Sequence, residues 1–199
     1  MGDMCRMLKT PVVGGNVSLY NESDEFETQI PPTPCIGMAG KGPVRKHLAA
    51  EPGQKLAVIG RDEGSTGGSI LDAVTGCGGK APEVPDVSIL DHVRKLVNGG
   101  SVSSATDISR GGLLAAVVSL AGTADLKLSG DPLKRLFSES YGRFLVAVDD
   151  EKALEGVDYE MIGTAGGDSL RIKFEVGELL LGKDEIESAT GSTTRLMKY

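Results

Sequence analysis

The stretch Gly14-Gly15-Asn16-Val17-Ser18-Leu19-Tyr20-Asn21-Glu22 follows a short apolar segment, Val12-Val13, which we expect to be a strand. Two glycines end this strand, and glycine lets the main chain approach a phosphate or a base closely. Amide, hydroxyl and carboxylate oxygens follow at once, and Mg²⁺ prefers such hard ligands. By its spacing alone, the stretch is equally well explained as a ligand-binding loop or as a surface turn, because turns use the same residue types.

The composition is that of an acidic globular protein. Of the 199 residues, 40% are hydrophobic and 25% are charged, and the formal net charge is −7. Nucleic acid is therefore not expected as a partner, because binding a polyanion requires a basic face. No membrane segment is expected either, since no apolar run approaches the roughly 20 residues that cross a bilayer.

The three cysteines, Cys5, Cys35 and Cys77, are far apart and form no C-x-x-C pair. This spacing predicts neither a disulfide framework nor a zinc site. Unpaired cysteines fit a reducing compartment, so we expect a cytoplasmic protein.

Hydrophobic periodicity predicts an α+β fold, a mixed sheet packed with helices, because strands and helices follow one another without a strict β-α-β order. Strands are expected at 12–13, 35–40, 55–60, 104–108, 126–128, 144–148, 159–164 and 170–174. Helices are expected at 3–9, 68–75, 86–98, 113–121, 132–137 and 185–190. The polar segment 22–29 is expected to be a loop.

A second string, Ile30-Pro31-Pro32-Thr33-Pro34-Cys35-Ile36-Gly37-Met38, lies shortly after the first. Together the two strings resemble a signature of the phosphoribosylformylglycinamidine synthase family, G-N-x-S-x-Y-N-E followed by I-P-P-T-P-x-I-G-M. Later segments resemble the same family at 107–113, 137–143 and 162–172. Nearly the whole chain is therefore covered by the resemblance.

The family enzyme is much longer and holds two N-domain plus C-domain units related to aminoimidazole ribonucleotide synthetase. The resemblance implies that 1–42 is the end of the second N-domain, a strand-loop remnant, and that 43–52 is a linker. It implies that 53–199 is an α+β domain like the C-terminal domain of aminoimidazole ribonucleotide synthetase. A chain that starts inside a helix also suggests a piece of a longer protein. The strand remnant of the N-domain would leave an exposed sheet edge, which makes self-association of the piece plausible.

The resemblance implies an ATP-dependent carbon–nitrogen ligase of purine biosynthesis. Its substrate is formylglycinamide ribonucleotide, its product is formylglycinamidine ribonucleotide, and its ammonia comes from a glutaminase subunit or domain. Carried over residue by residue, Gly15 lies against ATP, Asn16 helps to hold Mg²⁺ and Ser18 contacts the substrate. The family's general acid/base histidine lies near its N-terminus, so we expect no catalytic residue here and no turnover by this chain without the remainder of the synthase.

Two later motifs depart from the family pattern. In TDISRGGL, Arg110 stands where the family has Asp, and Ser109 is expected to cap the following helix. In SESYGR, Tyr141 replaces a glutamine that, in the first-half copy of family members, contacts substrate. A structural role is the simpler interpretation of both motifs, and a functional role for Arg110 or Tyr141 stays open.

The glycine loop at 60–69 lacks the G-K-[ST] ending of a P-loop. We expect it to cap a helix, with Arg61, Asp62 and Glu63 solvated. His92 is expected to pack beside the apolar face of its helix rather than to act as a base.

Two other functions remain open. One is a non-catalytic scaffold or lid module. The other is a different ATP-using member of the superfamily, such as thiamine-monophosphate kinase or selenophosphate synthetase, although the strings at 20–22 and 31–34 argue against it.

Overall fold

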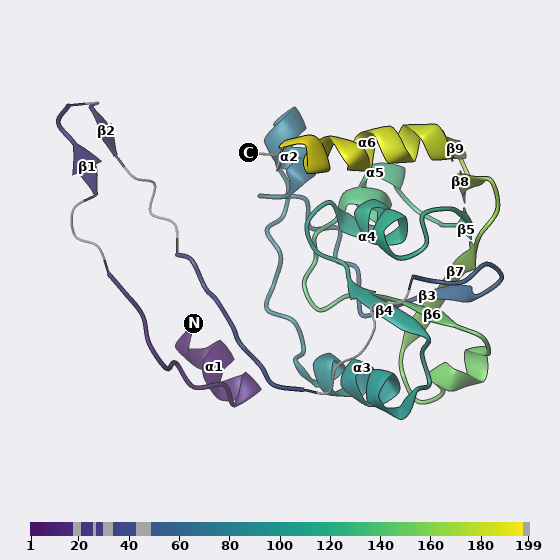
Figure 1. Ribbon diagram of the computed structural model, residues 1–199, viewed down its shortest axis with the longest axis horizontal. Helices are drawn as coiled ribbons and strands as arrows, with labels where there is room; N and C mark the ends of the chain where they lie inside the picture. The colour runs from purple at the N-terminus through teal and green to yellow at the C-terminus, as the bar shows by residue number, and fades with distance from the viewer. Residues whose placement is uncertain (18–20, 26, 30–33, 43–48, 197–199) are drawn as a thin grey trace. The chain divides into compact units, whose positions relative to one another are not determined.

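The computed structural model describes residues 1–17, 21–25, 27–29, 34–42 and 49–196. The chain divides into two compact units, Met1–Lys46 and His47–Tyr199 (Figure 1). The predicted linker at 43–52 lies largely outside the described residues.

The first unit contains little regular structure. Helix α1 (Gly2–Leu8) confirms the predicted helix at 3–9. The segment 22–29, predicted to be a loop, instead holds a small hairpin, because β1 (Glu22–Ser23) pairs antiparallel with β2 (Thr28–Gln29).

The strands predicted at 12–13 and 35–40 are wrong, since neither segment forms a strand among the described residues. A strand requires a neighbour that receives its backbone hydrogen bonds, and the described part of this unit pairs only β1 with β2. The apolar side chains of these segments are exposed instead: Val13 by 96% and Met38 by 70%.

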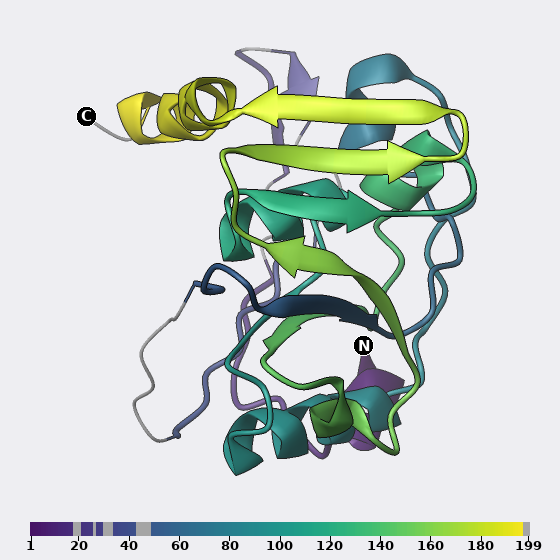
Figure 2. The ribbon, with the colours of Figure 1, turned by 90° about the vertical axis from the view of Figure 1, so that its right-hand side faces the viewer.

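The second unit is built on a seven-stranded sheet with the order β4-β6-β3-β7-β5-β8-β9. The strands are β3 (Lys55–Ile59), β4 (Ser104–Asp107), β5 (Ala124–Lys127), β6 (Phe144–Val148), β7 (Tyr159–Ala165), β8 (Ser169–Phe174) and β9 (Gly177–Gly182). Neighbouring strands are antiparallel except β5 and β8, which are parallel. Figure 2 shows β9, β8, β5 and β7 side by side. The predicted mixed sheet is confirmed.

The α-helices of this unit lie where the sequence predicts them, and a 3₁₀-helix that was not predicted follows β6. They are α2 (Ile70–Thr75), α3 (Ser88–Gly99), α4 (Gly112–Leu120), α5 (Pro132–Phe137), the 3₁₀-helix η1 (Glu151–Leu154) and α6 (Lys183–Leu196). Helix α6 is longer than the predicted helix at 185–190. Among the described residues, no helix combines the length and the apolar character that a membrane crossing requires.

Two hydrophobic clusters occupy the two faces of the sheet. In β6, Leu145 and Ala147 belong to the cluster that includes α4, whereas Val146 and Val148 belong to the cluster that includes Val93 of α3. Both sets are buried completely, because helices cover both faces of this strand. A strand covered on both sides has a continuous apolar sequence rather than an alternating one, which explains the run FLVAV.

Candidate functional site

The predicted ligand loop lies in the first unit. Gly15 and Asn16 are exposed in the segment 11–17, and Ser18 lies outside the described residues. A Cβ added at Gly15 would meet no atom of the described structure within 4 Å, and the residue does not have a positive φ. The described fold therefore does not itself require glycine at this position.

No candidate metal site of histidine, cysteine and carboxylate side chains is present in the described ranges. Asn16 has an amide oxygen, which is a hard ligand of the kind that Mg²⁺ accepts. Its exposure leaves that oxygen accessible, so the residue fits a magnesium ligand and the assignment remains a prediction.

In the second unit, the glycine loop after β3 contains a buried ion pair. The Asp62 carboxylate Oδ2 lies 3.2 Å from Nη2 of Arg143 and 3.4 Å from Nη1 of Arg135. The side chain of Asp62 is only 10% exposed, so its predicted solvation is wrong. Arg61 and Glu63 are exposed, as expected. The sequence gives no sign of this pair because its partners lie far apart along the chain.

Arg143 begins the turn into β6 and has no exposed side-chain surface. Its Nη1 donates a hydrogen bond to the carbonyl oxygen of Ser138 at 3.3 Å. Burial lowers the pKa of the Arg143 guanidinium, and the neighbouring Asp62 carboxylate opposes this shift. Asp62 therefore compensates a charge that would otherwise be buried alone.

The two serines of the SES sequence connect the same loops. The Ser140 hydroxyl oxygen accepts hydrogen bonds from the backbone N–H groups of Glu63 (3.1 Å) and Ser65 (3.3 Å). The hydroxyl oxygens of Ser138 and Ser140 lie 2.8 Å apart. Both serines are buried, so these hydroxyl groups hold the loop after β3 against the loop before β6.

Glu139 joins two helix N-termini. Its Oε1 accepts hydrogen bonds from the backbone N–H of Ile70, the first residue of α2, and of Gly111, the N-cap of α4, each at 2.9 Å. Free N–H groups at helix N-termini attract anions, and here the chain supplies its own carboxylate. The prediction that Ser109 caps α4 is wrong, because Gly111 is the N-cap and its N–H is bound by Glu139. For α2, the predicted cap is confirmed: Ser69 accepts from the N–H of Asp72.

Replacing Glu139 by glutamine should lower the free energy of unfolding by about 1–2 kcal/mol, because a neutral oxygen accepts more weakly than a carboxylate. Urea denaturation of the 199-residue chain measures this change. The matched control is Glu187→Gln, an exposed residue of α6, which should change stability by less than about 0.5 kcal/mol. Equal stability of the two variants would show that Glu139 does not hold the helices.

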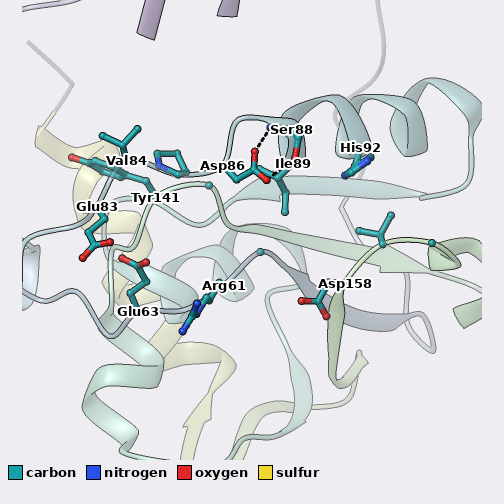
Figure 3. A pocket seen from close by; sticks show the side chains of 15 residues that line it. Arg61, Glu63, Glu83, Val84, Asp86, Ser88, Ile89, His92, Tyr141 and Asp158 are labelled. Atoms are coloured by element: carbon teal, nitrogen blue, oxygen red, sulfur yellow. Dashed lines mark hydrogen bonds between the residues drawn. The ribbon is translucent and has the colours of Figure 1, made fainter. Parts of the chain in front are cut away.

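A pocket of about 380 Å³ lies where four loops or elements meet. They are the loop after β3, the segment leading into α3, the loop before β6 and the loop before β7. Figure 3 shows Tyr141 beside Val84 at one end, and His92 and Asp158 toward the other. His92 is exposed at this pocket, so its expected packing role is wrong. Tyr141 is 60% exposed.

Glycines allow the loops to meet at the floor of the pocket. Gly60 has φ +97°, and a Cβ there would lie only 2.3 Å from the carbonyl oxygen of Gly142. A Cβ at Gly142, where φ is +71°, would lie 2.7 Å from Cβ of Pro85. Side chains at either position would therefore push the three loops apart.

Replacing Gly60 by alanine should lower the free energy of unfolding by about 1–3 kcal/mol more than replacing Gly53 by alanine, because only the side chain added at position 60 overlaps another atom. Gly53 is the matched control, since its φ is +93° and a Cβ there has no neighbour within 4 Å. Its own replacement should cost about 1–2 kcal/mol of backbone strain. Thermal unfolding of both variants checks this difference, and equal midpoints would contradict it.

Residues 51–169 match the family described as AIR synthase related protein, C-terminal domain. The chain belongs to this family. The match covers the described sheet from β3 through β7, together with the loops that form the ion pair and the pocket. It agrees with the predicted likeness to the C-terminal domain of aminoimidazole ribonucleotide synthetase.

Curated relatives of this AIR synthase related domain extend the likeness to the first unit. The chain is 41% identical over 216 residues to "Phosphoribosylformylglycinamidine synthase subunit PurL" of Methanosarcina mazei, covering 99% of this chain and 30% of that protein. The subunit of the same name from Limosilactobacillus reuteri is 36% identical, covering 90% of this chain and 26% of that protein. The chain thus spans less than a third of the length of these relatives.

Solved structures agree on the fold of this AIR synthase related domain. Thermotoga maritima PurL complexed with ATP superposes with a TM-score of 0.52 at 18% identity, covering 70% of this chain and 26% of that one. The PurL complex with FGAR gives a TM-score of 0.53 at 17% identity, covering 70% and 28%. At this level of identity the likeness shows the α+β fold alone.

Proposed function

We propose that the chain is the C-terminal portion of an ATP-dependent ligase that converts formylglycinamide ribonucleotide into formylglycinamidine ribonucleotide in purine biosynthesis. The observation that carries the proposal is the 41% identity to a named synthase subunit over 99% of this chain. The linked strings at 14–22 and 30–38 support it, because they lie outside the part that matches the domain family.

Within this function, Gly15 lies against ATP, Asn16 is a ligand of Mg²⁺, and Ser18 contacts the substrate. An amide oxygen is a poor leaving group, so phosphoryl transfer from ATP to that oxygen prepares the carbon for attack by ammonia, and phosphate then departs. Mg²⁺ supplies charge neutralisation at the ATP phosphates. The G-N-x-S string at 15–18 supports these roles, and Asn16 is exposed and therefore accessible to an ion.

The proposal includes three further properties. The ammonia comes from a glutaminase subunit or domain, the rest of the synthase completes the active site, and the protein works in the cytoplasm. The cysteines Cys5, Cys35 and Cys77 are free, which suits a reducing compartment. Exposed apolar residues in the first unit, such as Val13, also support self-association of the chain when the rest of the enzyme is missing.

A non-catalytic role is the second candidate for the chain by itself. The exposed position of Gly15 and Asn16 favours it, because a single open loop does not exclude water from a reacting phosphate. We expect no turnover when the 199-residue chain is mixed with ATP, Mg²⁺, formylglycinamide ribonucleotide and ammonia. Product formation under these conditions would eliminate this candidate.

A chimera tests the ligase function. The matching C-terminal portion of the Methanosarcina mazei subunit is replaced by this chain, and amidine formation is measured with ATP, Mg²⁺ and ammonia. We expect activity within about tenfold of the parent, since 41% identity preserves the domain packing. A folded chimera that phosphorylates thiamine monophosphate, or that forms no amidine, would contradict the proposal.

A further inference from the structure

The pocket that Tyr141 lines contains polar side chains that form no bond within the fold. Within the described part of the chain, the side chains of Tyr141 and Asp158 form no hydrogen bond or ion pair, whereas Arg61 interacts electrostatically with Glu83, and His92 with Asp86. They come from four different segments that the tertiary structure brings to one cavity. Tyr141 and Asp158 therefore lie at one cavity without partners of their own, which is typical of a ligand site.

Other polar groups of the pocket are already occupied. The Asp86 carboxylate accepts hydrogen bonds from the N–H and the hydroxyl of Ser88, which hold the pKa of Asp86 below its ordinary value. The Glu83 carboxylate lies 2.6 Å from Nζ of Lys80. Both interactions are made within the segment that leads into α3, so these two carboxylates already have partners in the protein.

The shape of the pocket favours a flat ring at one end. Tyr141, which is 60% exposed, lines the pocket together with Val84 and Pro85, and Figure 3 shows Tyr141 beside Val84. Ring stacking on an exposed tyrosine is favourable and tolerates many heterocycles. The volume of about 380 Å³ lies in the range of small-molecule sites.

The charge of the pocket disfavours strongly anionic ligands. Four carboxylates line it, those of Glu63, Glu83, Asp86 and Asp158. Two cations stand against them: the Arg61 guanidinium, and Nζ of Lys80, which lies 2.6 Å from Glu83 and 3.9 Å from Glu63. A phosphate group would meet repulsion from this excess of negative charge. Hydroxyl and amino groups, in contrast, donate well to carboxylates, and an acidic side chain is a common acceptor for ribose hydroxyls.

We propose that this pocket binds an uncharged purine nucleoside. The base stacks on Tyr141 against Val84 and Pro85, the ribose hydroxyls donate to the Asp158 carboxylate, and the Arg61 guanidinium donates to an acceptor nitrogen of the base. The site belongs to the second unit and is separate in sequence from Gly15 and Asn16, to which the ATP and Mg²⁺ roles are assigned. The inference therefore does not depend on the ligase function.

Calorimetric titration of the 199-residue chain with adenosine tests the site. We expect saturable binding that weakens about tenfold or more in Tyr141→Ala, because stacking of a base on an aromatic ring is lost. Tyr141→Phe should restore binding to within about threefold, since the ring remains. Asp158→Asn should also weaken binding about tenfold, because a hydrogen bond to a charged group is lost.

Three controls make the result decisive. Asp184→Asn, an exposed change on α6, and Asn16→Ala should both leave adenosine binding unchanged. AMP should bind more weakly than adenosine, because of the carboxylates that line the pocket. The proposal is overturned by absence of adenosine binding, by binding that is insensitive to Tyr141→Ala, or by tighter binding of AMP. If Asn16→Ala abolishes adenosine binding, the nucleoside binds in the first unit, and the proposal is overturned as well.

Discussion

Replacing Asp62 by alanine should lower the free energy of unfolding by about 3–5 kcal/mol. The change leaves the Arg143 guanidinium, which has no exposed surface, without the carboxylate that lies 3.2 Å away. Arginine does not lose its proton in the accessible pH range, so the charge stays buried and uncompensated. Urea denaturation of the chain, followed by circular dichroism, measures the loss.

Two controls separate the buried pair from the loop that carries it. Glu63→Ala alters the next residue, whose carboxylate is 3.9 Å from Nζ of Lys80 in an exposed pair, and it should cost less than about 1 kcal/mol. The double variant Asp62→Ala with Arg143→Met removes both charges and should recover most of the loss. If Asp62→Ala and Glu63→Ala are equally stable, Asp62 does not compensate Arg143.

In the chimeric synthase, Asn16→Ala should lower kcat/KM for amidine formation by about 100-fold, the loss typical when one group that stabilises transition-state charge is removed. The Mg²⁺ concentration for half-maximal activity should rise in parallel, because one oxygen ligand is missing. Steady-state kinetics at a series of Mg²⁺ concentrations measures both effects.

The matched comparison is Arg110→Ala. Arg110 is exposed just before α4, so this substitution should change kcat/KM by less than about threefold. Asn16→Asp keeps an oxygen ligand and should retain more activity than Asn16→Ala. Equal effects of Asn16→Ala and Arg110→Ala would refute the magnesium assignment, and so would an unchanged Mg²⁺ requirement.

Much of the second unit could be predicted from local sequence patterns. The run Phe144 to Val148 is apolar throughout and forms β6, and the 3.6-residue spacing of Ile89, Val93 and Leu96 predicts the face that α3 buries. Strand β9 was not predicted, although Leu179 and Leu181 pack inward while Leu180 is 50% exposed. Three adjacent leucines hide this alternation, since no polar residue marks the outward position.

The side-chain network of the second unit could not be predicted, because it depends on tertiary contacts. Asp62 was expected to be solvated, yet it compensates a buried arginine. A structural role was expected for the SESYGR motif, but the sequence did not indicate that Glu139 accepts hydrogen bonds from two helix N-termini. Periodicity reports which face of an element is apolar, but it does not report which distant loop faces a given charge. For the same reason, nothing in the sequence groups Arg61 with Asp158.

The strands predicted in the first unit failed for a different reason. Val12-Val13 and the segment 35–40 have apolar residues of the right kind, but a strand forms only where a neighbour completes its hydrogen bonds. Local preference for strand depends strongly on such context.

Strand β3 is an interior strand of the sheet, although both of its neighbours come much later in the chain. Lys55 pairs with Val148 of β6 on one side and with Thr164 of β7 on the other. During translation, β3 therefore leaves the ribosome well before either neighbour has been made, and the buried residues Leu56 to Ile59 remain open to water and to other nascent chains. Strand β3 can pair on both sides only after β7 has emerged from the ribosome. A ribosome that stalls earlier would therefore present an aggregation-prone chain.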